Sequence, residues 1–451
     1  MNDSVSTALS DFAAHTRARF HMPGHKGRGA GALPFDMALP YDVTELDATD
    51  NLYAPAPDGV FRAELDFMRS VYGTAATIIT AGGATAAICA AVACCARRSP
   101  GLSMLCDRKA HISVINALAL TGVEPVWFDA GAVTDAKIDE FTSNLSGAQY
   151  SAVFITSPDY YGTARDVASL AKLSAKLGAP LIVDNSHGAH LFFHGDGTLH
   201  PLKQGAALVI DSLHKTLPAL TGGALLHAAD IYADDDAQFD FTEAELLSAL
   251  RLFTSTSPSY LISSSVCACV RELAESGNIA HAALLREVTS VRSRLAALGF
   301  TLDTPDDDPF RICICYGDAQ GLYDYLARNG VVCEFCDGHR VVLLTSIRNT
   351  HDDFALLTDL CAGYKPVAPE NNSLSYEFYL PQRAITLREA LLSRQERVPL
   401  ATAFGRIAAS PAAPYPPGIT CIAPGEVYDE KVIAALGNAG VTECDVVLWK
   451  E

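Results

Sequence analysis

The sequence is poor in basic residues and lacks the long hydrophobic runs of membrane proteins. Its 451 residues include 33 Lys and Arg against 52 Asp and Glu, a formal net charge of −19. We expect no nucleic-acid partner, because phosphate recognition needs a basic surface. The alanine-rich run 86–96 is interrupted by Arg97 and Arg98. Since about 20 apolar residues are needed to span a bilayer, we expect no membrane segment.

Cysteine is plentiful but is not arranged as a metal site. The 13 cysteines are unevenly placed, and the polar segment Met1–Ser10 does not look like a secretory leader. Cys333 and Cys336 have metal-ligand spacing, yet the sequence offers no second pair to complete a tetrahedral set. Cys313-Ile314-Cys315 alternates as a strand would. We therefore expect reduced thiols, no metal and a cytoplasmic protein.

A lysine and an acidic residue follow two strand-like runs. The apolar residues 207–211 lead into Ser212-Leu213-His214-Lys215, and Pro180-Leu181-Ile182-Val183 stops at Asp184. The 31 residues that separate Asp184 from Lys215 leave room for a strand, a crossover and a second strand, as a βαβ-like unit requires. Both side chains are therefore expected to face one cleft.

This pair of residues suits pyridoxal phosphate. The aldehyde of that cofactor reacts with a lysine whose pKa is depressed by burial or nearby cations, and Lys215 is the candidate. Asp184 is the candidate for the buried carboxylate that keeps the ring nitrogen protonated. An aspartate at a strand end is also a common cap, and a loop lysine is usually solvated. Ser212 and His214 favour the cofactor interpretation, because both can donate hydrogen bonds to a phosphate.

Two further segments fit the same cofactor. Residues 77–80, the turn Gly82-Gly83-Ala84-Thr85 and the run 86–96 indicate a strand, a glycine turn and a helix whose N-terminus can hold a phosphate. Glycine pairs before helices are also ordinary turn residues. His111 follows the strand-like run 102–105, and its imidazole can stack on the pyridine ring. A lone histidine there is equally well a loop residue with a satisfied hydrogen bond.

These segments, in this order, resemble the ornithine/lysine/arginine decarboxylases, which are pyridoxal-phosphate enzymes of aspartate-aminotransferase-like fold, in their short form without an N-terminal wing domain. The most specific match is Ser212 through Leu220, which is similar to the family's Ser-x-His-Lys-Thr-Leu-Pro-Ala-Leu. The other similar segments are His21–Gly27, Asp42–Asp47, Asp50–Leu52, Asp184–His190, Thr254–Tyr260, Gly405–Ile407, Pro414–Ile419 and Pro424–Glu426. The resemblance therefore runs from about His21 to Glu426.

The resemblance implies a role for each candidate residue. Lys215 would bind the cofactor aldehyde, Asp184 the pyridine nitrogen, and His111 would stack on the ring. Thr85, Ser212 and His214 would contact the phosphate, with Gly83 and Ala84 in the same turn, and His187 would lie beside the ring near Lys215 or the 3-hydroxyl. The segment Ser257–Tyr260 would reach the phosphate of a partner subunit, so the resemblance implies a homodimer or a higher homo-oligomer with shared sites.

The chain departs from the family pattern near the expected site. Ala84 stands where relatives usually have a hydroxyl residue, and losing that phosphate hydrogen bond costs about 1–3 kcal/mol of binding unless the backbone replaces it. Asn185 replaces the family's Glu. The other departures are Ile112, Ser186, Cys267 and Ser410. They leave open a cofactor-binding but inactive homologue that serves as a partner or regulatory subunit.

We predict an α/β architecture with a large cofactor domain and two smaller ones. Alternating strand and helix patterns from about Thr74 to Leu226 indicate a doubly wound, mostly parallel sheet. A helix over residues 278–298 would lead into a smaller α/β domain, and the stretch 365–372 looks like a linker. The expected bounds are 1–55 for an N-terminal segment, 56–255 for the large domain, 256–364 for the small α/β domain and 365–451 for a C-terminal domain.

The predicted activity is decarboxylation of arginine, lysine or ornithine to the amine, a reaction of polyamine metabolism. His187 or Lys215 would return a proton to the α-carbon. A long cationic side chain calls for acids in the pocket, which the sequence does not identify. Transamination or elimination on the same scaffold is the alternative, and it needs an arginine for the α-carboxylate. Arg383 and Arg406 are the candidates for that arginine.

Overall fold

The computed structural model contains a seven-stranded sheet of order β2-β8-β7-β6-β5-β3-β4. The residues that it describes are 17–20, 51–145, 147–230, 239–303, 307–365, 367–368, 379–413 and 420–448. The strands of this sheet are β2 (Thr74–Thr80), β3 (Ser103–Asp107), β4 (Pro125–Phe128), β5 (Tyr150–Thr156), β6 (Leu181–Asp184), β7 (Leu208–Ser212) and β8 (Ala224–Ala229). β8 is the one strand of this sheet that runs opposite to the other six. The prediction of a mostly parallel sheet is therefore confirmed.

Helices cover both faces of the sheet, as the apolar character of its strands requires. They are α2 (Val60–Tyr72), α3 (Gly83–Arg98), α4 (Ile112–Thr121), α5 (Ile138–Asn144), α6 (Val167–Leu177), α7 (Leu213–Thr216) and α8 (Glu243–Leu250). The short 3-10 segments are η3 (Ala130–Ala132), η4 (Asp135–Lys137), η5 (Ala189–Phe193) and η6 (Pro201–Lys203). The crossover between β6 and β7 consists of η5 and η6 and contains no α-helix.

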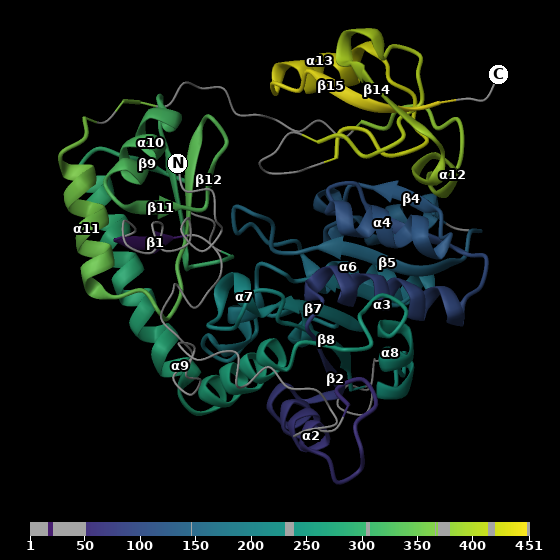
Figure 1. Ribbon diagram of the computed structural model, residues 1–451, viewed down its shortest axis with the longest axis horizontal. Coiled ribbons are helices and arrows are strands. Elements are labelled where there is room, and N and C mark those ends of the chain that lie inside the picture. Colours follow the sequence, from purple (N-terminus) through teal and green to yellow (C-terminus); the bar gives the residue numbers. More distant parts are fainter. Residues whose placement is uncertain are drawn as a thin grey trace.

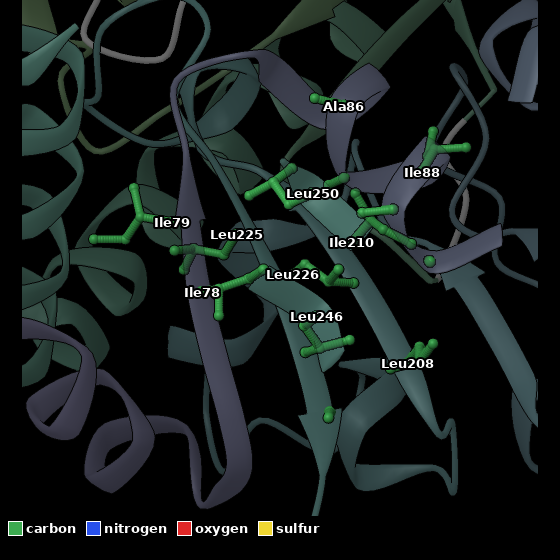
Figure 2. Close-up of a cluster of buried hydrophobic side chains, with 14 of the residues drawn as sticks. Ile78, Ile79, Ala86, Ile88, Leu208, Ile210, Leu225, Leu226, Leu246 and Leu250 are labelled. Atoms are coloured by element: carbon green, nitrogen blue, oxygen red, sulfur yellow. The ribbon is translucent and has the colours of Figure 1, made fainter. Parts of the chain in front are cut away.

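The central helix α3 explains the alanine-rich run. All residues from Ala86 to Cys95 are buried, so α3 packs on all sides and has room mainly for small side chains. Figure 2 shows Ala86 and Ile88 of α3 in the same buried cluster as labelled side chains of β2, β7, β8 and α8. This packing fixes the N-terminus of α3 close to the strand ends that carry the predicted site.

The smaller α/β part begins with the long helix α9 (Tyr260–Ala297), which runs from below the main sheet to the smaller sheet (Figure 1). The smaller sheet has the order β12-β13-β10-β9. The bounds are β9 (Thr301–Leu302), β10 (Arg311–Cys315), α10 (Ala319–Arg328), β11 (Val331–Cys333), β12 (Phe335–Cys336), β13 (Arg340–Leu344) and α11 (His351–Ala362). Strand β1 (Ala18–Phe20) pairs in parallel with β11.

The prediction of a helix over 278–298 was wrong at its start, since α9 begins at Tyr260. Ser259 caps the helix, and its Oγ accepts a hydrogen bond from the N–H of Ile262 at 3.5 Å. Small residues such as Ser263, Ser265 and Cys269 are buried in the first half. They hide the apolar periodicity by which a helix is recognised in sequence.

The C-terminal part lies against the β4 edge of the main sheet (Figure 1). It contains α12 (Leu387–Leu392), β14 (Gln395–Pro399), η7 (Leu400–Thr402), α13 (Glu430–Asn438) and β15 (Glu443–Val447), and β14 pairs antiparallel with β15. The predicted domain boundaries stay a prediction. The similar segments His21–Gly27, Asp42–Asp47 and Pro414–Ile419, and most of the predicted linker, lie outside the described residues. In the described part, no helix is long and apolar enough to cross a membrane.

A buried ion pair joins the C-terminal part to the main sheet. Arg108 Nη1 and Nη2 donate to the two carboxylate oxygens of Glu426 at 2.8 and 2.7 Å, and the side chains are 1% and 3% exposed. Arg108 Nη2 also donates to the carbonyl of Cys421, and the guanidinium lies 5.1 Å from the centre of the Trp127 ring. Since Arg108 directly follows β3, the pair fixes the start of the loop that leads to His111.

We predict that Glu426→Gln destabilises the protein strongly, because it leaves the buried Arg108 charge without a counter-charge. Removing one partner of a buried pair costs about 3–5 kcal/mol of unfolding free energy. Urea unfolding followed by circular dichroism measures the loss. Asp139→Asn, which removes the exposed partner of Lys176, is the control and leaves the transition where it is. Equal midpoints for Glu426→Gln and wild type would contradict the prediction.

Candidate active site

The predicted site residues lie around one cavity of about 300 Å³ at the carboxyl ends of the central parallel strands. Ligands bind at this edge in open α/β sheets, because the loops after neighbouring strands meet there. Its lining includes Gly83, Ala84, Thr85, His111, Asp184, His187, Ser212, His214 and Lys215. The structure thus brings every one of the predicted cofactor residues to a single cavity, although their roles stay a prediction.

Lys215 lies in α7, directly after β7, and its amine is close to a histidine. Its Nζ is 3.0 Å from Nε2 of His187 and 5.7 Å from the centre of the Tyr160 ring. Burial lowers the pKa of Lys215, while the nearby Asp184 carboxylate opposes that shift. Burial, reinforced by the Lys215 charge, lowers the pKa of His187 well below its usual range. A neutral His187 and the lysine amine therefore share a hydrogen bond.

Asp184 ends β6, and its carboxylate is held by the turn that follows. Its Oδ1 accepts hydrogen bonds from the backbone N–H of Ser186, at 3.1 Å, and from the Ser186 hydroxyl. The residue is only 3% exposed and lines the cavity. Ser186, one of the departures from the family pattern, therefore helps to orient the carboxylate.

His111 serves as the N-cap of α4 and also lines the cavity. Its Nδ1 accepts a hydrogen bond from the N–H of Ser113 at 3.2 Å and lies 2.8 Å from the Ser113 hydroxyl. Burial lowers the pKa of His111. The cap holds a neutral ring in a fixed orientation, so the capping and stacking interpretations of this residue are compatible.

The other end of the cavity has hydrogen-bond donors suited to an anion. Helix α3 starts there, and the N–H groups of its first turn point out of its N-terminal end. The N–H of Gly83 donates to the carbonyl of Gly222 at 2.8 Å, so Gly83 shapes the turn and does not donate to a ligand. The N–H of Gly222 donates to Nδ1 of His214 at 3.3 Å, and the same Nδ1 lies 3.3 Å from Ser212 Oγ and 3.4 Å from the Gly223 carbonyl oxygen, so these contacts hold the His214 ring in place.

The cavity also contains residues that the sequence reasoning missed. They follow β5, in the loop from Thr156 to Arg165, and include Asp159, Tyr160 and Tyr161. β5 ends at the same sheet edge as β6, so the rule that located Asp184 could have located this loop too. The residues were missed because the aromatic pair and the single acid match no simple motif.

Some predicted residues lie elsewhere. Arg383 pairs with Glu124 at 2.7 Å and Arg406 with Glu396 at 3.0 Å, both on the surface and outside the cavity lining. In this chain neither holds a substrate carboxylate in the cavity. Tyr260 of the expected partner-reaching segment is 3% exposed and packs on Phe61 with ring centres 5.2 Å apart.

The departures from the family pattern have different surroundings. Ala84 lines the cavity at the first turn of α3, where a backbone N–H can take the place of a hydroxyl. Cys267 is buried within α9 and does not line the cavity, Ile112 is 44% exposed, and Ser410 donates to Asp445 at 3.1 Å. In the described part of the chain, no group of His, Cys, Asp or Glu is placed to hold a metal ion.

The fold and the family agree with this site. The chain superposes on a lysine decarboxylase from Francisella novicida with a TM-score of 0.72 and 17% identity, covering 90% of this chain and 74% of that one. Serine palmitoyltransferase with PLP gives a TM-score of 0.58 at 14% identity, covering 76% of this chain and 86% of that one. The architecture is therefore that of the pyridoxal-phosphate-dependent decarboxylases and transferases, as predicted.

Sequence comparison identifies the family within that class. The model of the Orn/Lys/Arg decarboxylase major domain matches residues 4–303, and that of the family's C-terminal domain matches residues 373–437. An arginine decarboxylase from Bacillus subtilis is 25% identical, covering 95% of this chain and 91% of its own length. The uncharacterized protein YaaO of the same organism is 27% identical, covering 97% and 94%. The chain belongs to the Orn/Lys/Arg decarboxylase family.

We predict that Lys215 is acylated at lower pH than a surface lysine in the cofactor-free protein. Burial lowers its pKa, so the neutral, nucleophilic amine is present at a pH where ordinary lysines are still protonated. Lys172 is the internal control, since its hydrogen bond to Asp135 raises its pKa. Competitive labelling with a trace of acetic anhydride, read by mass spectrometry from pH 6 to 11, checks the order. If labelling of Lys215 begins at the same pH as that of Lys172, or at a higher pH, the prediction is wrong.

Proposed function

We propose that this protein decarboxylates arginine, lysine or ornithine with pyridoxal phosphate held in the cavity. Family membership supports the reaction class. The observation that carries the proposal is the meeting of one partly buried amine, Lys215, one buried carboxylate, Asp184, and a helix N-terminus in the lining of the same cavity. These are the groups that an aldehyde, a pyridine nitrogen and a phosphate require.

Each residue has a separate task in this proposal. Lys215 Nζ would hold the cofactor aldehyde, Asp184 would keep the pyridine nitrogen protonated, and His111 would contact the ring. Ser212, His214 and the first turn of α3 would hold the phosphate. When bound, pyridoxal phosphate supplies the electron sink for the negative charge left on the α-carbon by departing CO2.

The contact between Lys215 and His187 supports a proton-transfer role. Decarboxylation breaks the bond between the α-carbon and the carboxylate, and a proton must then be added to that carbon to give the amine. Lys215 Nζ lies within hydrogen-bond distance of His187 Nε2, so a proton can pass between them. Lys215, set free when the substrate amine takes its place on the aldehyde, would deliver that proton to the α-carbon, and His187 would share the proton of the amine between turnovers.

We also propose a cytoplasmic homodimer that takes only small-molecule substrates. The support is the family resemblance of residues 254–260, in which Ser255, Thr256 and Ser257 are exposed. Because Tyr260 is buried within its own chain, the exposed residues Ser255, Thr256 and Ser257 are the members of this segment that can reach a partner's cavity. Such a contribution would complete the phosphate end of each site.

We predict that the protein, reconstituted with pyridoxal phosphate, releases CO2 and the matching amine from at least one of lysine, arginine and ornithine. Manometric or isotopic CO2 release, with chromatography of the amine, measures the reaction. A keto acid in place of the amine would show transamination. No CO2 release from any of the three substrates, despite bound cofactor, would show an inactive homologue. Either result overturns the proposal.

We predict that Lys215→Ala abolishes covalent retention of the cofactor. Borohydride reduction followed by dialysis leaves the wild type labelled at Lys215, whereas the variant loses the cofactor, as mass spectrometry shows. Decarboxylation falls by at least about 100-fold, because a positioned acid–base group is removed. Lys203→Ala, at the exposed last residue of η6, is the control and retains the label. A variant that stays labelled elsewhere in the cavity would refute the assignment of Lys215.

A further inference from the structure

The cavity has very few carboxylates for a site that is to bind a cationic side chain. Among its described lining residues only Asp159 and Asp184 carry one, beside the cations Lys109, Arg165 and Lys215. Asp184 is already bonded to the Ser186 turn and assigned to the pyridine nitrogen. A substrate ammonium or guanidinium that enters a low-dielectric cavity must find a negative partner, since an unpaired buried charge is costly.

Asp159 is held in place by its own loop. Its Oδ1 accepts hydrogen bonds from the N–H groups of Tyr161 and Thr163 at 2.9 and 3.0 Å, and its own N–H donates to the carbonyl of Thr163. In the part of the chain that the structure describes, both hydrogen bonds to the carboxylate end on Oδ1. The second oxygen, Oδ2, is therefore left as an acceptor for a ligand.

The loop is also fixed from the smaller α/β part. The Tyr161 hydroxyl donates to Asp337 Oδ2 at 2.8 Å, and the N–H of Ala164 donates to Asp307 Oδ2 at 2.9 Å. The N–H of Arg165 donates to the hydroxyl of Ser157 at 3.0 Å. A carboxylate on a loop held at these points loses little conformational entropy when a ligand binds.

The neighbours of Asp159 leave it available to a cation. Arg165 and Arg311 both lie close enough to lower the pKa of Asp159. The guanidinium of Arg165 has Asp107 as its ion-pair partner at 3.5 Å, and that of Arg311 has Asp308 at 3.3 Å. Burial is the larger influence and raises the pKa of Asp159. A bound cation would stabilise the ionised carboxylate and remove that penalty. The adjacent Tyr160 ring is also in the lining, where it lies 4.3 Å from the His187 ring and 5.7 Å from Lys215 Nζ, so it borders the space beside Asp159.

We propose that Asp159 is the specificity-determining residue that receives the cationic end of the substrate side chain, through Oδ2 and beside the Tyr160 ring. The inference rests on the proposed decarboxylation of a basic amino acid and deepens it. A purely structural role for Asp159 in closing the loop would be satisfied by Oδ1 alone. A variant that removes the charge and keeps the Oδ1 acceptor therefore distinguishes substrate binding from loop closure.

Asp159→Asn makes that separation. Asparagine can keep the two hydrogen bonds to Tyr161 and Thr163 but carries no charge. For the preferred basic amino acid we expect KM to rise roughly 10- to 100-fold, with kcat changed less than KM, as the loss of a charged hydrogen bond predicts. The inhibition constant of the amine product should rise by a similar factor. That of norleucine, a neutral analogue of lysine, should stay the same.

Asp166→Asn is the matched control. Asp166 is exposed, lies next to Arg165 and caps α6, where asparagine caps equally well, so the same charge is removed outside the cavity. Its KM values should equal those of wild type. Unchanged KM and amine inhibition in Asp159→Asn, or an equal loss of norleucine binding, would overturn the role of Asp159.

Failure of the proposed function gives a different result. In that case the wild type decarboxylates none of the three basic amino acids. Calorimetric titration of the cofactor-loaded protein with cadaverine, putrescine and agmatine then still tests Asp159. Weaker binding to Asp159→Asn than to wild type and Asp166→Asn supports a cation site, and equal affinities for all three proteins refute it.

Discussion

The hydrogen bond between Lys215 Nζ and His187 Nε2, at 3.0 Å, is the contact on which the chemistry of the cavity depends. Burial lowers the pKa of both groups, so the amine gives up its proton readily and the imidazole stays neutral. An amine in water would be protonated and unable to attack an aldehyde. The parallel pairing of β6 and β7 makes the contact possible, because His187 lies in the turn after β6 and Lys215 lies in α7, directly after β7.

The position of His187 depends in turn on the smaller α/β part. Arg311 Nη2 donates to the carbonyl of His187 at 3.1 Å, and its Nε lies 3.3 Å from Asp308 Oδ2. Asp308 Oδ1 is 3.0 Å from Nε2 of His190, two residues after the turn glycine. The Arg311–Asp308 ion pair lies within the smaller α/β part, and two contacts join it to the large part: the hydrogen bond from Arg311 to the His187 carbonyl and the contact between Asp308 and His190. Rotation of the smaller sheet would break these two contacts and disturb the cavity at the same time.

The strands that carry Asp184 and Lys215 were predictable because each is a continuous apolar run followed by polar residues. Parallel strands bring their carboxyl ends, and the polar residues there, to one edge of the sheet. The residues that surround Asp184 and Lys215 in three dimensions could not be predicted. Sequence spacing allowed any crossover between β6 and β7, and it gave no sign that Arg311, from another sheet, supports His187. Asp159 was missed for a related reason. Its importance comes from one free carboxylate oxygen in a closed loop, which depends on which N–H groups the other oxygen accepts.

The departure from the family pattern at Asn185 has an explanation on the opposite face of the sheet. Side chains alternate along a strand, so Asn185 points away from Asp184, and its Nδ2 donates to Asp211 Oδ1 at 2.6 Å. Asp211 is fully buried and also pairs with His200 and His227 at 3.0 and 3.2 Å. A glutamate at position 185, as the family resemblance has it, would place a second carboxylate against Asp211, whereas asparagine supplies a donor. The hydrogen bond to Asp211 therefore gives Asn185 a structural partner outside the cavity lining.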